Sequence, residues 1–300
     1  MSGAKVGGAS FTYEVAEGWG QLPNGWQLGQ TAAVATDSRD RVYVFHRPPQ
    51  DEPPVLVFDR DGTLVASWGK DFLEDAHGMT IGPDPTDGGA ERLWLVDRRP
   101  HVVQKCTLAG TVLQTLGTRG SAGDQIPFNR PTDVSLAPNG DLYVSDGYGN
   151  ARVHRFAADG RLIRSWGVPG KGPGEFNLVH SVWVDRHGGR EGPGRILVAD
   201  RENHRIQRFT PNGEYLGEWG GFRQPTDLFV DGDGFIYVPE LQHRLSILDS
   251  DGQVVARWGG EPRREPGAFV APHGACVDSR GDLYVCEVLQ GQRLQKFVHI

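Results

Sequence analysis

The chain has 300 residues, of which 38% are hydrophobic and 23% charged, with 42 glycines, 20 prolines and a formal net charge of -7. This acidic balance argues against binding to nucleic acid or an acidic membrane surface, because both favour a basic protein face. The many turn-forming residues suit short strands joined by tight turns, and the length allows a sizeable core. We therefore expect neither nucleic-acid nor membrane partners.

The amino-terminal residues lack the apolar stretch of a signal peptide, and no segment has the roughly 20 apolar residues that cross a bilayer. The three cysteines are odd in number and irregularly spaced, which disfavours a disulfide framework. They are Cys106, Cys276 and Cys286. The sequence thus predicts a cytoplasmic protein, and we expect a monomer or a weak homo-oligomer.

A repeat runs along the whole chain, and it predicts short strands. A Trp-Gly or Leu-Gly step recurs at Trp19, Trp68, Leu116, Trp166, Trp219 and Trp258. Most steps follow an X-Gly pair typical of a hairpin turn, such as Asp61-Gly62 or Asn212-Gly213. Upstream lie the strand-like runs RVYVFHR, RLWLVDR, DLYVSDG, RILVADR, FIYVPEL and DLYVCEV. Four short strands per unit, at a period of about 40 to 55 residues, are typical of a β-propeller.

The two ends of the chain complement each other. The last repeat stops near residue 298, before any Trp-Gly strand, and residues 11–20 supply the missing piece. We therefore predict that this amino-terminal strand completes the last blade and closes the ring. The predicted fold is an all-β, six-bladed β-propeller that occupies residues 1–300 as one domain.

The segment ADRENHRIQRF (199–209) and its echo VPELQHRLSILD (238–249) resemble the NHL-repeat family. In this resemblance His204 and His243 are structural polar residues between strands. Asp146 and Asp200 hold matching points in their blades, where we expect them to orient backbone or arginine. The Trp/Leu-Gly steps are interpreted as packing between blades. The remaining histidines lack convergent spacing and are interpreted as surface or loop residues: His46, His101, His154, His187 and His299.

One position of the repeat breaks the pattern. Aligned on the innermost strand, the six blades place Ala32, His77, Thr132, His180, Thr226 and His273 at the axis. Histidine makes up 10 of the 300 residues, yet it fills three of these six positions, in every second blade. Blades two apart are separated by roughly 120°, so the three imidazoles converge on the axis. Three neutral imidazoles with an open position suit catalytic zinc, although imidazole also binds iron, copper or nickel. The alternative is a water-filled channel lined by histidines.

The chain is similar to the peptidyl-α-hydroxyglycine α-amidating lyase family. The similarity covers nearly the whole chain and is carried by residues 130–156, FNLVHSVWVD (176–185) and VADRENHRIQRF (198–209), with shorter matches at VFHR (44–47) and APHG (271–274). The resemblance implies that His77, His180 and His273 bind zinc. It also implies that Tyr148, from a Ser-Asp-Gly-Tyr segment, is the active-site tyrosine and that Arg47 and Arg201 are the arginines near the metal.

The resemblance further implies a structural calcium, but one ligand is missing here. The family's aspartate after the third histidine is replaced by Gly274, while the other two ligands are backbone carbonyls that map to Val34 and Met79. Calcium favours anionic oxygen, so this loss argues against it. Asp133 and Asp227 follow the axial column in their own blades and are candidates to substitute for the lost carboxylate.

The implied activity is a lyase reaction on a carbinolamide, R-CO-NH-CH(OH)-COOH, which gives an amide and glyoxylate without a redox cofactor. Zinc would stabilise the substrate alkoxide, Tyr148 would transfer a proton, and Arg47 and Arg201 would hold the carboxylate. Two alternatives remain open: a metal-dependent hydrolase of a lactone, ester or amide, and a non-catalytic NHL scaffold. The sequence leaves open whether the substrate is a peptide or a small metabolite.

Overall fold

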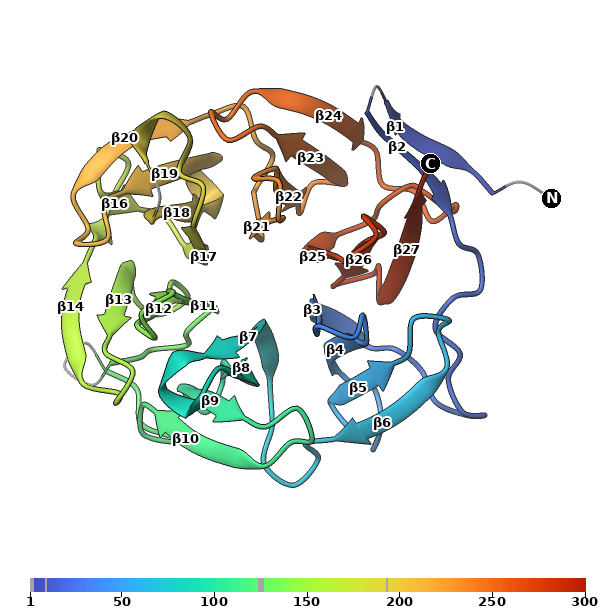
Figure 1. The fold of residues 1–300 in the computed structure, drawn as a ribbon, viewed down its shortest axis with the longest axis horizontal. Helices are drawn as coiled ribbons and strands as arrows, with labels where there is room; N and C mark the ends of the chain where they lie inside the picture. Colours follow the sequence, from blue (N-terminus) through green and yellow to red (C-terminus); the bar gives the residue numbers. More distant parts are fainter. Residues whose placement is uncertain (1–2, 9, 124–126, 193) are drawn as a thin grey trace.

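The structure is a computed structural model that describes residues 3–8, 10–123, 127–192 and 194–300. Six antiparallel sheets stand in a ring around a central axis (Figure 1), which confirms the predicted all-β, six-bladed propeller. In each sheet the strand nearest the axis pairs with the next along the chain, and the series continues outward. Among the described residues, no helix is long and apolar enough to cross a membrane.

Blades one to three follow each other directly along the chain. Blade one contains β3 (Gln30–Thr36), β4 (Val42–Arg47), β5 (Val55–Phe58) and β6 (Leu64–Trp68). Blade two contains β7 (Ala76–Asp84), β8 (Ala90–Asp97), β9 (Val102–Cys106) and β10 (Val112–Leu116). Blade three contains β11 (Asp133–Leu136), β12 (Leu142–Asp146), β13 (Arg152–Phe156) and β14 (Leu162–Trp166).

Blades four to six complete the ring. Blade four contains β17 (Val179–Asp185), β18 (Arg195–Asp200), β19 (Arg205–Phe209) and β20 (Tyr215–Trp219). Blade five contains β21 (Phe229–Val230), β22 (Ile236–Glu240), β23 (Arg244–Leu248) and β24 (Val254–Gly259). Blade six contains β25 (Pro272–Val277), β26 (Leu283–Glu287), β27 (Arg293–His299), β2 (Phe11–Val15) and β1 (Lys5–Gly8). The loops add the short parallel pair β15 (Val168–Pro169) and β16 (Glu175–Phe176), and the 3-10 helices η1 (Pro85–Asp87), η2 (Gly189–Glu191) and η3 (Arg201–Asn203).

The amino-terminal strand closes the ring as predicted, because β2 pairs antiparallel with β27 in blade six. The strand is shorter than expected and ends at Val15, so residues 16–20 leave the sheet. Trp19 instead packs at the junction of the last and first blades, with ring centroids 5.1 Å from Tyr284 and 5.5 Å from Phe58. The sequence repeat also did not predict β1, which adds a fifth strand outside β2.

The Trp-Gly and X-Gly steps of the repeat meet at the junctions between blades. The Trp68 ring of blade one lies against Gly110 in the outer hairpin of blade two, where an added Cβ would come within 2.6 Å of it. Gly252 stands in the same relation to Trp219, at 2.3 Å. Both glycines have φ near +90°, so the backbone of the turn favours glycine, and the neighbouring Trp ring leaves no space for a side chain. The predicted packing role of these steps is therefore confirmed.

The second strand of most blades ends in a buried acid that accepts backbone N–H groups from the loop before the first strand. Asp97 accepts from Glu74 and Asp75, and Asp200 accepts from Asn177 at 2.7 Å. Asp146, Glu240 and Glu287 make the same kind of contact in their blades. These acids satisfy donors that would otherwise be buried and unpaired. Asp146 and Asp200 thus orient backbone, as predicted.

The expectation that His46 and His154 lie on the surface or in loops is wrong, because they are only 1% and 3% exposed. His46 stands in blade one where the other blades have an acid, and its Nδ1 accepts the N–H of Gly29 at 3.2 Å. His154 bonds Ser165 at 2.7 Å and Asp146 at 3.3 Å. Both histidines therefore serve the hydrogen-bond network of their blades.

Deleting residues 1–20 should destabilise the whole ring. The deletion removes Phe11, Tyr13 and Val15, which are all buried, and exposes the edge of β27. Burial of each such side chain is worth about 1.5–3 kcal/mol, so we expect the Tm to fall by roughly 10 °C or more. Deleting residues 1–8 removes only β1 and should change the Tm far less. A 1–20 deletion that melts like the full chain would contradict this account of closure.

Candidate metal centre

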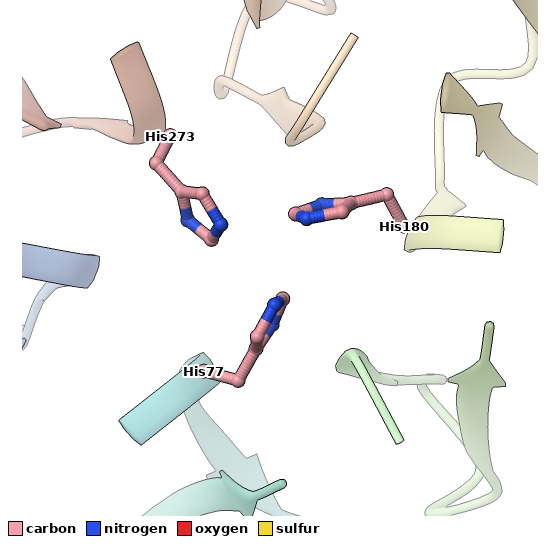
Figure 2. A group of neighbouring side chains, drawn as sticks. All are labelled: His77, His180 and His273. Carbon is pink, nitrogen blue, oxygen red and sulfur yellow. The ribbon is translucent and has the colours of Figure 1, made fainter. Parts of the chain in front are cut away.

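Three histidines converge on the propeller axis. His77 lies on β7, His180 on β17 and His273 on β25, and their rings point toward one another (Figure 2). Their candidate ligand nitrogens all lie within 4.8 Å of one another. None of the three residues is more than 5% exposed. The structure therefore brings together the three axial histidines that the repeat singled out.

Each axial histidine is held by the blade that follows it around the ring. His77 Nδ1 lies 2.6 Å from the carbonyl oxygen of Thr132, and His180 Nδ1 lies 2.5 Å from that of Thr226. His273 Nδ1 lies 2.7 Å from the carbonyl oxygen of Ala32, across the closure of the ring. A carbonyl only accepts, so Nδ1 must carry the proton and donate it. The Nε2 lone pairs are thereby left to face the axis, as in histidines that bind metals.

The surroundings of the three rings favour the neutral form that metal binding requires. Burial lowers the pKa of His273 to about 3. Burial also lowers the pKa of His77 well below its usual value, and the neighbouring His180 and His273 act in the same direction. The pKa of His180 is likewise well below its usual value, through burial and then through the nearby charge of Arg201. Three neutral imidazoles with converging Nε2 atoms can hold a transition metal.

Tyr148 stands directly over this cluster. Its hydroxyl oxygen lies 3.3 Å from His77 Nε2 and 3.4 Å from His180 Nε2. Arg201 Nη1 donates to the same oxygen at 3.4 Å. Tyr148 follows Gly147, where an added Cβ would lie 1.8 Å from the carbonyl oxygen of Val179. This close approach explains the glycine of the Ser-Asp-Gly-Tyr segment, because only glycine lets the loop reach the start of β17.

Arg47, the second predicted arginine, lies on the same side of the cluster. Its Nη1 donates to Gln30 at 3.4 Å, and its Nε lies 3.8 Å from Asp75. The buried Nε of Arg47 has no hydrogen-bond partner within the described part of the chain. Burial and the neighbouring Arg98 lower the pKa of Arg47 below its usual value. An unpaired buried donor is costly, so this guanidinium is suited to an anionic ligand.

Arg98, which was not predicted from the sequence, lies beside Tyr148, with its Cζ 4.8 Å from the ring centroid. A signal was available, because Arg47, Arg98 and Arg201 each end the second-strand run of their blade. The backbone confirms that two of them are equivalent. The backbone N–H of Arg98 donates to the carbonyl oxygen of Asp75, and that of Arg201 donates to the carbonyl oxygen of Leu178. Both acceptors stand two residues before an axial histidine. Blades five and six have Leu241 and Val288 at this position.

A second polar layer lies along the axis next to the histidines. Ser181 Oγ is 2.7 Å from Asp133 Oδ2 and 3.1 Å from Asp227 Oδ1. One hydroxyl proton can serve only one of these carboxyl groups, so the other contact needs a protonated carboxyl. Burial raises the pKa of Asp227 to about 7 and, together with the charge of Asp227, raises that of Asp133 well above its usual value. The pair therefore holds a proton readily.

The calcium ligands suggested by the resemblance lie near this pair. Val34 and Met79 line a cavity of about 50 Å³ that Asp133 and Asp227 also line. Gly274 offers no carboxylate, and an added Cβ there would meet Cys286 Sγ at 3.0 Å. Whether Val34 and Met79 bind calcium stays a prediction, with Asp133 and Asp227 as the nearby carboxyl groups.

Comparisons with known proteins place the chain among NHL-repeat propellers. The NHL repeat matches residues 128–156 and 194–209. NHL repeat-containing protein 3 of Mus musculus is 30% identical over 293 residues, which cover 90% of this chain and 80% of that protein. Peptidyl-alpha-hydroxyglycine alpha-amidating lyase 1 of Drosophila melanogaster is 27% identical over 341 residues, covering 96% of this chain and 60% of that protein.

Solved structures share the fold at low identity. A gluconolactonase from Xanthomonas campestris superposes with a TM-score of 0.65 at 15% identity, covering 91% of this chain and 86% of that one. A catalytically inactive variant of virginiamycin B lyase from Staphylococcus aureus gives a TM-score of 0.60 at 15% identity, covering 95% and 88%. At such identities the likeness shows the fold alone.

Purified protein should contain close to one transition metal per chain by elemental analysis. Substituting alanine for any one of His77, His180 and His273 removes a third of the nitrogen ligands, so each variant should lose most of the metal. The exposed His187→Ala serves as the matched control and should keep it. Full metal content in all three axial variants would contradict the site.

The pH dependence of stability should report the Asp133–Asp227 pair. The folded pKa of Asp227, about 7, lies above its unfolded value near 3.9, so its contribution is present below about pH 4 and lost as pH rises through 7. Asp227→Asn imitates the protonated form. In metal-free protein we expect this variant to gain stability relative to the parent between pH 5 and pH 8, by on the order of 2 kcal/mol or more.

Denaturant titrations at both pH values provide this measurement, with the exposed Asp233→Asn as the control. A difference between Asp227→Asn and the parent that does not change with pH would contradict the raised pKa. Added calcium at pH 8 should stabilise the parent but not Asp227→Asn if the pair replaces the missing carboxylate at residue 274.

Proposed function

This chain belongs to the NHL-repeat family, and we propose that it is a metal-dependent lyase that cleaves the C–N bond of a carbinolamide. The observation that carries the proposal is the position of the Tyr148 hydroxyl, within 3.4 Å of Nε2 of both His77 and His180 and of Arg201 Nη1. The likeness to the Drosophila amidating lyase supports the same reading. The reaction would convert R-CO-NH-CH(OH)-COO⁻ into R-CO-NH₂ and glyoxylate.

His77, His180 and His273 would hold the metal, for which we propose zinc, through their three Nε2 atoms. A zinc ion bound there would act as a Lewis acid and favour loss of the proton from the substrate hydroxyl. The Nδ1–H bonds to backbone carbonyls keep each imidazole in the tautomer that this role needs. The histidines themselves transfer no proton in this scheme.

The remaining residues account for the proton and for the carboxylate. The substrate hydroxyl loses a proton as its carbon becomes an aldehyde, and the departing amide nitrogen gains one, so the overall reaction is balanced. Tyr148 would accept the first proton and return it to nitrogen. Arg47, whose buried Nε lacks a hydrogen-bond partner, and Arg201, whose Nη1 donates to the Tyr148 hydroxyl, are suited to hold the carboxylate.

A metal-dependent hydrolase is the second candidate, favoured by the shared fold with a gluconolactonase. Such an enzyme would act on a lactone, ester or amide. A non-catalytic scaffold fits less well, because recognition on a propeller face has no use for three buried axial histidines. We also propose a cytoplasmic location, since Cys106, Cys276 and Cys286 are all free thiols. The substrate is either a peptide or a small metabolite.

α-Hydroxyhippurate tests the proposal directly, because it is a minimal carbinolamide with a carboxylate. Metal-loaded protein should split it into benzamide and glyoxylate. Tyr148→Phe removes one positioned proton-transfer group and should lower kcat by about 10²–10⁴ at unchanged metal content. The exposed Tyr215→Phe is the matched control and should stay fully active. Product assay by chromatography measures both compounds.

Arg201→Ala separates the lyase from its alternatives. It should impair α-hydroxyhippurate cleavage far more than cleavage of a carbinolamide without the carboxylate, since only the first substrate has a carboxylate that loses its guanidinium partner. Protein that leaves all carbinolamides untouched but hydrolyses lactones or esters would favour the hydrolase. A fully active Tyr148→Phe would refute the role of the tyrosine.

A further inference from the structure

Arg98 contacts a buried carboxylate on one side and the ring of Tyr148 on the other. Its Nε and Nη2 donate to the two oxygens of Asp75 at 2.8 and 3.2 Å. Its guanidinium lies over the ring of Tyr148, with Cζ 4.8 Å from the ring centroid. Asp75 is only 3% exposed and lies two residues before His77. The carboxylate therefore ties Arg98 to the strand that provides a metal ligand.

These contacts distinguish Arg98 from the other two arginines. Arg47 has a buried Nε without a hydrogen-bond partner. Arg201 pairs with the partly exposed Glu202 at 2.8 Å, and its Cζ lies 5.8 Å from the Tyr148 ring centroid, farther than that of Arg98. Arg98 has two donors fixed on Asp75 and presents its flat face to the aromatic ring, an arrangement that restricts the ring instead of leaving the charge free for a ligand. Its place in the repeat matches Arg47 and Arg201, but its anchoring carboxylate is more deeply buried than Glu202 and its contact with the Tyr148 ring is shorter than that of Arg201.

The loop around Tyr148 needs such a restraint. The chain approaches β17 closely at Gly147, where an added Cβ would lie 1.8 Å from the carbonyl oxygen of Val179, but this approach does not itself hold the Tyr148 ring. Arg201 holds the hydroxyl through a single contact of 3.4 Å, a long hydrogen bond. The face of Arg98 supplies a second, independent restraint.

We propose that Arg98, anchored by Asp75, is a positioning residue that fixes the Tyr148 ring so that its hydroxyl faces Nε2 of His77 and His180. This rests on the lyase reaction proposed above. Arg98 acts through Tyr148 and takes no part in holding the substrate carboxylate, which falls to Arg47 and Arg201. Asp75 acts on Tyr148 through the arginine that it anchors.

The kinetic test compares kcat with KM. Arg98→Met should lower kcat for α-hydroxyhippurate by about 10- to 100-fold, because a displaced catalytic group costs rate, while KM stays within about twofold. Arg98→Lys keeps the charge but loses the planar fork, so it should recover only part of the rate. The exposed neighbour Arg99→Met is the matched control. A raised KM at unchanged kcat would make Arg98 a substrate ligand and overturn the proposal.

Asp75 provides a second test and guards against misfolding. Arg98→Met leaves Asp75 buried near Arg47 alone, so the paired variant Asp75→Asn/Arg98→Met removes the stranded charge. If Asp75 acts through Arg98, Asp75→Asn should lower kcat in the parent but add little in the Arg98→Met background. Independent, additive losses would overturn the anchoring role of Asp75. Metal content and Tm are measured for every variant.

A spectroscopic measurement separates this proposal from the proposed reaction. In protein labelled with 3-fluorotyrosine, the fluorine signal of Tyr148 among the 7 tyrosines is assigned by its loss in Tyr148→Phe. That signal should shift in Arg98→Met and stay in place in Arg99→Met. An unmoved signal would overturn the positioning contact. A signal that shifts in protein that cleaves no carbinolamide would support the contact and refute the reaction instead.

Discussion

The site depends on one hydrogen bond that is made three times: each axial histidine donates Nδ1–H to a backbone carbonyl of the next blade. This bond fixes the tautomer, aims Nε2 at the axis and ties every second blade to its neighbour. One of the three bonds joins His273 to Ala32, 241 residues apart, and so spans the closure of the ring. The cluster of three histidines therefore forms only if the propeller closes, and the strand at Phe11–Val15 contributes to the site by closing it.

The position of a residue within the repeat determines its distance from the propeller axis. Residues at one point of the repeat lie at one height and radius, so a histidine in alternate blades makes a cluster and an arginine after the second strand reaches it. Blade three departs from this rule, because the loop after β12 approaches the start of β17 closely at Gly147. This close approach positions Tyr148 at the axis. The proposed function depends on side chains at equivalent positions of the repeat and on the one loop, at Gly147 and Tyr148, that departs from the repeat.

Much of this arrangement could be predicted from the sequence. The blade count, the closing strand and the axial column follow from periodicity, because equivalent residues of a propeller repeat occupy equivalent places. Arg98 was accessible to the same logic but was missed, since the family resemblance pointed only to Arg47 and Arg201. The raised pKa values of Asp133 and Asp227 were not predictable in this way, because they come from burial and, for Asp133, also from the charge of Asp227. β1 has no counterpart in the other blades, so the repeat gave no signal for it.

X-ray absorption at the edge of the bound metal tests the central claim most directly. For zinc we predict three imidazole nitrogens at about 2.0–2.1 Å, together with one water oxygen that substrate or inhibitor replaces. The nitrogen shell should be lost in the His180→Ala variant and preserved in His187→Ala. A shell of sulfur or of carboxylate oxygens, or a spectrum unchanged by His180→Ala, would show that the metal lies elsewhere and that the axial histidines do not bind it.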